Sequence, residues 1–385
     1  MLNIKILGGG PAGLYAAYLI RKQLPDAQVT VFEQNDARTT FGFGVVFSDK
    51  ALEFLGAEDS ETLPLITAGL EKWSDIELCL HGQRIRIDGV GFTAIARLRL
   101  LEILRQRALS VGATLINSTV ICDLAELGEA DLIIGADGVN SLVRTTYETQ
   151  FGTEIQLLNN RFAWFGATRP FDYLTQTFRQ LPQGNFNAHH YRYTPSMSTF
   201  LVEVDGQTFD RVGFADMSEE QSREYCEGVF EEVLDGAQLV TNKSVWRRFP
   251  VISNRHWTHG NCVLVGDALR TAHFSIGSGT RLALEDVQAL SHAIANHPNN
   301  VQDALAEYEA QRRPIVEKLA VAATRSATWY DQFAEHLNQS AWDFAMSYIS
   351  RSGRIDMERL RAMSPQFVSG YEQFRSTVCQ AKDTQ

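Results

Sequence analysis

Cysteine is scarce in this chain and forms no motif. The 385 residues include five cysteines, none of them in a CxxC pair. This pattern excludes a disulfide framework, a redox dithiol and a cysteine-based zinc site. Histidine, cysteine and acidic residues do not cluster with the spacing of metal ligands, so we expect no metal site. A chain with so few cysteines suits a reducing compartment, and we expect a cytoplasmic protein.

Long apolar runs and an excess of positive charge are missing too. No stretch approaches the roughly 18 apolar residues that a membrane span requires, and the apolar run at the N-terminus is too short for a signal peptide. The formal net charge is -11, which argues against a nucleic acid or an anionic membrane as a partner. An anionic ligand in a local basic pocket stays compatible with this charge. The length favours two domains or one elaborate domain, at about 150 residues per domain.

The clearest motif that is present lies near the N-terminus. Gly8, Gly10 and Gly13 have the GxGxxG spacing between two short apolar runs, and Glu33 follows about 20 residues after the last glycine. This order predicts a strand, a glycine turn, a helix and a parallel strand. The turn and the helix N-terminus would bind a pyrophosphate, while the acid would accept a hydrogen bond from a ribose hydroxyl. The alternative is a glycine turn that serves only close packing.

Two later apolar runs end in the same way. Residues 132–134 lead into Gly135-Ala136-Asp137-Gly138, and residues 263–265 lead into Gly266-Asp267. Between them, over residues 161–204, short alternating segments separated by turns predict an antiparallel meander. Residues 76–87 are typical of a hairpin. The C-terminal part is predicted to be helical, with one helix over residues 303–312 that ends at Pro314 and another from Val316.

Three strands that end in glycine and acid, with a meander inserted before the last, resemble the FAD-dependent aromatic hydroxylases of the p-hydroxybenzoate hydroxylase fold. The resemblance rests on residues 8–13 (GGGPAG), 135–144 (GADGVNSLVR) and 266–268 (GDA). Residues 41–48, 73–76 and 271–280 also resemble the branch of salicylyl-CoA 5-hydroxylase and anthraniloyl-CoA monooxygenase. The chain departs from that branch at Leu269-Arg270, where Ala-His is usual, so its substrate could differ.

The resemblance implies an α/β fold: a Rossmann-like FAD-binding domain with an inserted mixed or antiparallel β-sheet substrate domain and C-terminal helices. The expected FAD-binding domain is discontinuous and comprises residues 1–75, 96–160 and 251–300. The expected substrate domain comprises residues 76–95 and 161–250. Residues 301–385 would form the C-terminal helical region.

The function that the resemblance implies is aromatic hydroxylation. Such an enzyme binds FAD, takes NAD(P)H and dioxygen as co-substrates, and delivers oxygen through a flavin hydroperoxide that the protein shields from water. The branch implies an aryl-CoA thioester, such as a salicylyl- or anthraniloyl-CoA, and a monomer or homodimer. A free aromatic compound or a tryptophan-derived indole is the alternative substrate. A flavin oxidase or dehydrogenase, or a non-catalytic FAD-binding protein, is the alternative from another class.

The resemblance also assigns roles to single residues. Glu33 would bind the ribose of the FAD adenosine, Arg97 the phosphates, and Asp267 the ribityl or ribose hydroxyls. The backbone N–H groups of residues 275–280 would face the pyrimidine carbonyl of the flavin, where negative charge collects on reduction. The candidate FAD-binding residues are Gly8, Gly10, Pro11, Ala12, Gly13, Glu33, Val46, Arg97, Asp137, Asp267, Gly277, Ser278, Gly279 and Thr280.

His273 and His189 are the candidate catalytic residues. His273 stands between Asp267 and the flavin loop, where a proton donor would be useful, although a histidine that only caps the loop is the alternative. His189 and His190 adjoin on a strand, so at most one of them faces the cavity, and we expect His189. Other meander candidates, each with a surface or core role as the alternative, are Arg179 and Arg192 for CoA phosphates and Phe162, Trp164, Phe186, Tyr191 and Tyr193 for the walls over the flavin.

Overall fold

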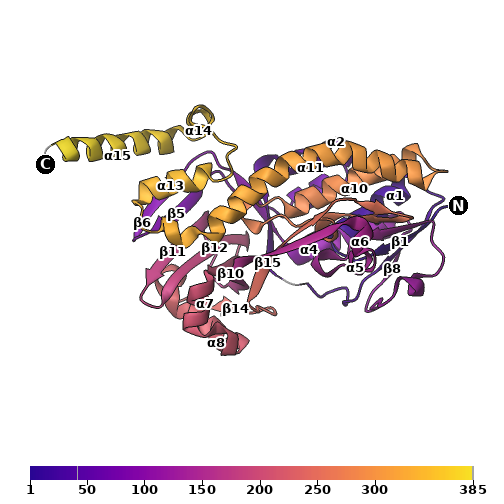
Figure 1. Ribbon diagram of the computed structural model, residues 1–385, viewed down its shortest axis with the longest axis horizontal. Helices are drawn as coiled ribbons and strands as arrows, with labels where there is room; N and C mark the ends of the chain where they lie inside the picture. The colour runs from indigo at the N-terminus through magenta and orange to yellow at the C-terminus, as the bar shows by residue number, and fades with distance from the viewer. Residues whose placement is uncertain (41, 384–385) are drawn as a thin grey trace.

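The N-terminal residues form the strand, helix and parallel strand that the sequence predicts (Figure 1). β1 (Asn3–Leu7) pairs in parallel with β2 (Gln28–Phe32), and α1 (Pro11–Gln23) connects them. The computed structural model describes residues 1–40 and 42–383, so Phe41, the first residue of the stretch 41–48, lies outside the described residues.

Two later strands extend this parallel sheet. β9 (Leu132–Gly135) lies beside β1, and β17 (Cys262–Leu264) lies beside β9. With β8 (Thr114–Ile116) and β16 (Thr258–His259), the order is β16-β17-β9-β1-β2-β8. The helices α4 (Arg97–Ser110) and α10 (Gly279–Asn296) both pack against α1. Because β1, β9 and β17 are parallel, their carboxyl ends meet at one edge of the sheet.

The predicted meander is part of an eight-stranded mixed sheet. Its order is β14-β10-β13-β12-β11-β5-β6, and β15 also pairs with β10. β5 pairs with β11 in parallel, so the predicted hairpin over residues 76–87 joins the meander. These pairings confirm the expected fold class. The strands are β5 (Ile76–Leu80), β6 (Gln83–Ile87), β10 (Thr153–Ala167), β11 (Leu174–Leu181), β12 (Gly184–Thr194), β13 (Met197–Val204), β14 (Leu239–Val240) and β15 (Arg247–Asn254).

A third sheet has three strands, and along the chain the hairpin β5–β6 of the mixed sheet falls between two of them. It consists of β3 (Gly44–Ser48), β7 (Phe92–Ala96) and β4 (Glu71–Trp73). Residues 92–95 therefore pair outside the meander sheet. β10 runs without a break through the boundary that we predict between residues 160 and 161. The division into domains stays a prediction, and a shared strand connects the two regions.

The C-terminal region is helical, but the predicted break at Pro314 is wrong. α11 (Val301–Asp331) continues through Pro314. Tyr308 and Val316, on either side of the proline, are buried in the core, whereas Pro314 itself is exposed. Packing on both sides therefore outweighs the cost of about 3 kcal/mol that an interior proline imposes. Figure 1 shows α11 running along much of the length of the molecule.

The remaining helices cover the mixed sheet and the flanks of the parallel sheet. α13 (Ala341–Ser350) packs against β5 and β6, and the far end of α15 (Pro365–Asp383) extends away from the rest of the molecule (Figure 1). Within residues 1–40 and 42–383, no helix combines the length and the hydropathy of a membrane span. The others are α2 (Glu53–Glu58), α3 (Thr62–Thr67), α5 (Leu142–Thr146), α6 (Glu148–Phe151), α7 (Gly206–Val212), α8 (Glu219–Val229), α9 (Glu231–Leu234), α12 (Phe333–His336) and α14 (Met357–Met363).

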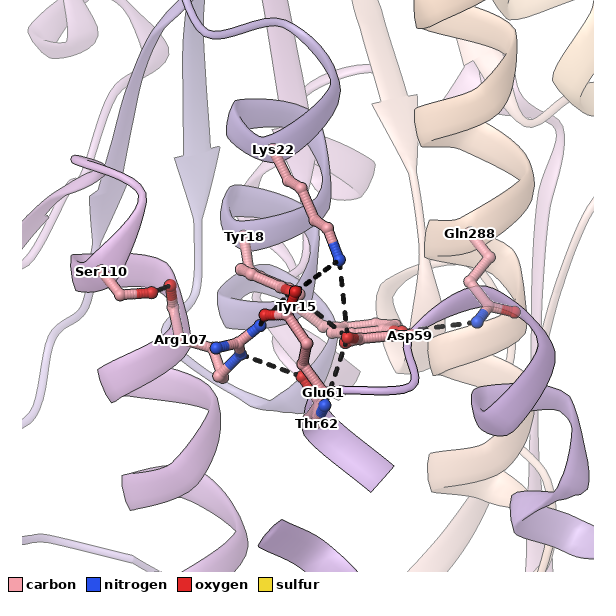
Figure 2. A network of polar contacts seen from close by, with 9 residues as sticks. All are labelled: Tyr15, Tyr18, Lys22, Asp59, Glu61, Thr62, Arg107, Ser110 and Gln288. Carbon is pink, nitrogen blue, oxygen red and sulfur yellow. Dashed lines mark hydrogen bonds and ion pairs between the residues drawn. The ribbon is translucent and has the colours of Figure 1, made fainter. Parts of the chain in front are cut away.

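A buried carboxylate fixes α1 to its neighbours (Figure 2). Asp59 is fully buried, and its Oδ1 accepts a hydrogen bond from the Tyr18 hydroxyl at 3.2 Å. The Nζ atom of Lys22 lies 3.8 Å from the same oxygen, which supplies a counter-charge. Arg107 on α4 donates to the Tyr18 hydroxyl and to the Glu61 carboxylate. The network holds α1, and with it the glycine turn, in a fixed position against α4.

Replacing Gly8 with alanine should destabilise the fold. Gly8 has φ +100, and a Cβ there would stand 2.3 Å from the carbonyl oxygen of Ala136. Both strain and overlap act on the contact between β1 and β9, so we expect a loss of about 2 kcal/mol or more in the free energy of unfolding. Thermal unfolding of FAD-free protein measures the effect.

The matched control is Gly10→Ala. Gly10 has φ -74, and no described atom lies within 4 Å of a Cβ built on it. This variant should melt within a few degrees of the wild type. Equal melting temperatures for Gly8→Ala and the wild type would show that the turn is not tightly constrained.

Candidate functional site

The carboxyl ends of β1, β9 and β17 bring the three glycine–acid motifs together. The turn after β1 touches the turn after β9, as the 2.3 Å from a Gly8 Cβ to the Ala136 oxygen shows. The turn after β17 lies against α1, since a Cβ on Gly266 would be 3.4 Å from the Cβ of Ala12. Segments from three distant parts of the sequence thus meet at one edge of the sheet.

The glycine turn leaves the N-terminus of α1 open. Pro11 occupies the first helical position, and the space around the Cβ position of Gly10 is free. Glu33 accepts hydrogen bonds from the backbone N–H of Gly9 at 2.7 Å and of Asn35 at 2.8 Å. Oε1 also accepts from Nδ2 of Asn35 at 2.8 Å, so Oε2, which accepts from Gly9, keeps a lone pair for a further donor. Helix N-terminus, turn and acid have the arrangement of a dinucleotide site.

Asp137 and Arg144 come from the second motif. The Oδ2 atom of Asp137 accepts from the backbone N–H of Leu142 at 2.7 Å, whereas its buried Oδ1 has no partner in the described structure. Burial raises the pKa of Asp137. Arg144 is itself buried, and its Nη1 donates to the carbonyl oxygen of Ala268 at 3.0 Å. Arg144 therefore fixes the second motif to the third, and the free Oδ1 can accept from a ligand.

Asp267 and Arg97 lie close to one another at this edge. The Asp267 residue is exposed, yet the surrounding protein desolvates its carboxyl and raises its pKa, which the charges of Arg97 and Arg270 oppose. Arg97 opens α4, and its Nε donates to the hydroxyl of Thr40 at 3.1 Å. Desolvation lowers the pKa of Arg97, and Asp267 counteracts this. An acid and a guanidinium group thus lie together at the edge of the sheet.

The predicted flavin loop precedes α10 and passes beside β3. Gly277 has φ +57, and a Cβ there would be 3.4 Å from Cγ1 of Val46. Ser278 is the residue before the helix and makes no side-chain cap, while Gly279 and Thr280 are its first two residues. The N–H groups of the first turn are therefore free to bind an acceptor, and they carry the positive end of the helix dipole.

A cavity of about 330 Å³ opens beside this loop. Gly277 and Ser278 of the loop and Val46 on β3 line this cavity. Other lining residues come from the mixed sheet and from α11, α13 and α14. One part is apolar and large enough for an aromatic ring. Its apolar lining includes Ile76, Phe92, Leu174, Phe274 and Leu282, and its polar lining includes Gln176, His189, Tyr191, Arg281, Arg351, Arg354 and Arg359.

The two candidate histidines occupy different places. His189 on β12 lines the cavity, and its Nδ1 lies 2.7 Å from Nε2 of Gln176. His273 is not among the residues that line the cavity, and its Nδ1 accepts from the backbone N–H of Ser275 at 3.3 Å, which caps the loop. Burial lowers the pKa of His189 well below the usual value and that of His273 to about 3. Both rings are neutral near pH 7, and of the two His189 borders the cavity.

Comparison with known sequences places this site in a family. Residues 126–323 match the FAD binding domain, and residues 6–39 match the NAD(P)-binding Rossmann-like domain. Salicyloyl-CoA 5-hydroxylase of Streptomyces sp is 39% identical over 365 residues, which cover 91% of this chain and 70% of that protein. The chain belongs to the FAD-dependent aromatic hydroxylases. The 3-hydroxy-4-methyl-anthranilyl-[aryl-carrier protein] 5-monooxygenase of Streptosporangium sibiricum is 36% identical over 334 residues, or 87% of this chain and 90% of that protein.

The fold agrees with this assignment. The structure of 2-methyl-3-hydroxypyridine-5-carboxylic acid oxygenase superposes with a TM-score of 0.69 over 94% of this hydroxylase and 96% of the other chain, at 19% sequence identity. The expectations of an FAD-dependent monooxygenase, of FAD as the cofactor and of NAD(P)H as the co-substrate are confirmed by the family.

Glu203, which no motif singles out, lies behind His189 in this hydroxylase. Its side chain is 2% exposed, its Oε1 accepts from Nδ2 of Asn160 at 2.8 Å, and its Oε2 is 3.6 Å from Nε2 of His189. Burial raises the pKa of Glu203 to about 8, so this carboxyl keeps its proton near neutral pH. The sequence signal that could have identified Glu203 was an acidic residue within the largely apolar strand segment 199–204.

Several polar atoms around His189 have no hydrogen-bond partner among the described residues. They are Oε1 of Gln176, Oδ1 of Asn187, Oδ1 of Asn160 and Oε2 of Glu203. Gln176 is opposite His189 in the strand register, and Asn187 is opposite Glu203, so these side chains share one face of the sheet. Buried acceptors in this state normally bind water or a ligand group. Of this cluster, His189 and Gln176 line the cavity, and because both are buried they give it a polar inner end.

The two arginines of the meander form ion pairs with acidic residues outside the cavity lining. Arg179 pairs with Glu232 at 2.6 Å, and Arg192 pairs with Glu71 at 2.6 Å; neither arginine is among the residues that line the cavity. Of the five aromatic residues suggested as walls, Tyr191 lines the cavity, whereas the lining does not include Phe162, Trp164, Phe186 or Tyr193. The strand alternation alone did not distinguish the cavity face from the core face.

The departure at Leu269-Arg270 has a structural explanation. Arg270 donates from Nη1 and Nη2 to the two carboxylate oxygens of Asp286, at 2.8 and 2.9 Å. Asp286 is fully buried, and the Nε of Arg312 on α11 also donates to it at 2.8 Å. Arg270 is therefore held in a buried ion-pair network that joins the third motif to α10 and α11.

Replacing Glu203 with glutamine should make stability less sensitive to rising pH. The pKa of this carboxyl is about 8 in the folded protein against an ordinary value of 4.5, so between these values the unfolded chain releases a proton that the folded protein keeps. The free energy of unfolding of the wild type therefore loses this contribution as the pH rises through that window. We expect the melting temperature of Glu203→Gln, relative to the wild type, to increase from pH 5 to pH 8.

Glu154→Gln is the control for this comparison. Glu154 is exposed on β10, so its replacement should leave the difference in melting temperature flat over the same pH range. If the melting temperatures of Glu203→Gln and the wild type change with pH in parallel, the carboxyl does not bind its proton more tightly in the folded state.

Proposed function

We propose that this hydroxylase binds FAD across the carboxyl ends of β1, β9 and β17 and hydroxylates the aromatic ring of an aryl-CoA thioester. The observation that carries the proposal is the cavity beside the loop before α10, which has an apolar middle, a polar inner end and arginines in its lining. The 39% identity to salicyloyl-CoA 5-hydroxylase supports a thioester rather than a free acid.

The residues at this edge of the sheet suit the parts of FAD one by one. In the proposal, Glu33 accepts from the adenosine ribose, and the open turn at Gly10 lets the pyrophosphate approach the N-terminus of α1. Arg97 binds a phosphate, and Asp267 accepts from the hydroxyls of the ribityl chain. The unpaired Oδ1 of Asp137 is a further acceptor at the same edge. Every one of these groups has an unused acceptor, donor or open approach in the structure.

Bound FAD would supply the redox chemistry by accepting a hydride from NAD(P)H and activating dioxygen. The protein positions the ring and excludes water from the cavity, which its apolar lining achieves. The free N–H groups of the first turn of α10 would stabilise negative charge on an acceptor beside Ser278 and Gly279, because the N–H of Gly277 already donates to the carbonyl oxygen of Phe274. His189, neutral at pH 7, is fixed at both ring nitrogens, at Nδ1 by Gln176 (2.7 Å) and at Nε2 by Asn187 (3.0 Å), and forms part of the cavity wall beside the ring.

Replacing Asp267 with alanine should weaken FAD binding. Loss of a charged acceptor for ligand hydroxyls costs about 1.5–3 kcal/mol, which corresponds to roughly a ten- to hundred-fold rise in the dissociation constant. We expect purified Asp267→Ala to contain less FAD and to gain less thermal stability when FAD is added.

Asp210→Ala is the matched control, because Asp210 is an exposed aspartate on α7. Asp286→Ala is unsuitable, since Asp286 is buried between two arginines. Equal FAD retention by Asp267→Ala and Asp210→Ala would place the ribityl contact on another residue.

Aryl-CoA thioesters should stimulate NAD(P)H oxidation and accept one oxygen atom on the ring. The test compares salicyloyl-CoA and anthraniloyl-CoA with the free acids, and it measures NAD(P)H consumption, hydrogen peroxide and the mass of the product. We expect coupled hydroxylation with a thioester and little stimulation by the acids. Full coupling with a free acid or an indole, and no reaction with thioesters, would disprove the CoA assignment but not the monooxygenase assignment.

A further inference from the structure

The exposed end of the cavity lies at the loop between α13 and α14. Arg351, Ser352, Arg354 and Ile355 of this segment line the cavity, and Arg359 on α14 lines it as well. Arg354 and Arg359 are exposed, in contrast to the buried residues at the His189 end. A long ligand with its ring at the inner end would therefore leave the protein past this loop.

Three guanidinium groups lie around this loop. A Cβ on Gly353 would stand 2.3 Å from Nη1 of Arg325, so the Arg325 side chain lies directly against the loop backbone. The Nη1 of Arg359 donates to the carbonyl oxygen of Arg354 at 3.4 Å. Arg325, Arg354 and Arg359 thus form a cluster, which we call the mouth arginines, with contributions from α11, the loop and α14.

The mouth arginines have no ion-pair partner among the described residues. Of the other arginines that line the cavity, Arg281 pairs with Glu285 at 2.7 Å, whereas Arg351 has no acidic partner in the described part of the chain and donates to the backbone carbonyl of Ser275 at 2.9 Å. Three unpaired cations at one loop repel one another, so an anion at this position would relieve the repulsion. In a chain of net charge -11, the cluster also gives an approaching polyanion a local attraction.

We propose that the mouth arginines bind the phosphate groups of CoA when the aryl group occupies the inner end of the cavity. Guanidinium groups bind phosphate through paired, charge-assisted hydrogen bonds. The proposal rests on the thioester function above and replaces Arg179 and Arg192 as the phosphate-binding candidates. The pantetheine arm, which is uncharged, then spans the distance between the mouth arginines and the ring.

The kinetic test compares two thioesters of the same aromatic acid in the FAD-loaded enzyme. One is the CoA thioester, and the other is the pantetheine thioester, which lacks all phosphates. The double variant Arg354→Ala and Arg359→Ala should raise the KM for the CoA thioester about ten- to hundred-fold with little change in kcat, the pattern of lost uniform binding. The KM for the pantetheine thioester should change less than two-fold.

The control is Arg361→Ala on the same helix. Arg361 is exposed and pairs with Glu372 at 2.7 Å, and it is not among the cavity-lining residues. This variant should leave both KM values unchanged. An equal rise in KM for the two thioesters in the double variant, or no rise in either, would overturn the proposal.

A binding measurement separates this proposal from the proposed function. In titration calorimetry, the FAD-loaded wild type should bind 3′,5′-ADP, which carries CoA phosphates without any thioester. The double variant should bind it with an affinity at least ten-fold lower. If the wild type binds 3′,5′-ADP in this way but hydroxylates no thioester, the thioester function fails and the phosphate site stands. If thioesters are hydroxylated but 3′,5′-ADP binds both proteins equally, the phosphate site fails alone.

One further comparison identifies the source of the phosphate. A 4′-phosphopantetheine thioester, or the same group on an aryl-carrier protein, has one phosphate and no adenosine. We expect its KM to exceed that of the CoA thioester in the wild type and to respond less to the double variant. A carrier-protein thioester with a lower KM than the CoA thioester would overturn the assignment of the mouth arginines to CoA.

Discussion

The parallel register of β1, β9 and β17 is the constraint on which the rest of the structure depends. It places three turns, far apart in sequence, at one edge of a single sheet. The turns approach so closely that Gly8 has no room for a side chain beside Ala136. Two arginines then fix the arrangement: the buried Arg144 donates to the carbonyl oxygen of Ala268, and Arg270 donates to the carboxylate of Asp286. The cofactor site proposed at this edge is thus a consequence of backbone packing.

The cavity depends on a different kind of organisation, because no single element contains it. The mixed sheet supplies His189 and Gln176, and the small sheet supplies Val46. The C-terminal region supplies the arginines at the exposed end, Arg351, Arg354 and Arg359. Burial makes the inner end neutral: His189 is unprotonated and the Glu203 carboxyl is protonated near neutral pH. Charge is concentrated at the exposed end instead. This separation suits a ligand with an uncharged aromatic group and an anionic tail.

The sequence was sufficient for the fold class, the three strand-end motifs and the cofactor, because each of them is a local pattern with fixed spacing. It did not reveal Glu203 or the mouth arginines, whose importance arises from contacts across the chain. Arg179 and Arg192 were chosen as basic residues on the meander, yet acidic partners from α9 and β4 bind them. The continuation of α11 through Pro314 could not be predicted either, since buried packing on both sides overrides the local preference.

The course of α11 has a consequence for how the substrate preference of this enzyme can evolve. Tyr308 near its start donates to the carbonyl oxygen of Leu264 in the parallel sheet, Ala322 lines the cavity, and Asp331 at its end accepts from the backbone N–H of Asn160. β10 crosses between the same two regions. A substrate-binding part cut out along any single boundary would lose its contacts with α11 or divide β10, so it is not an exchangeable cassette. New substrate preferences would accumulate by replacement of individual side chains within a shared frame, and chimaeras of relatives joined near residue 160 would fold poorly.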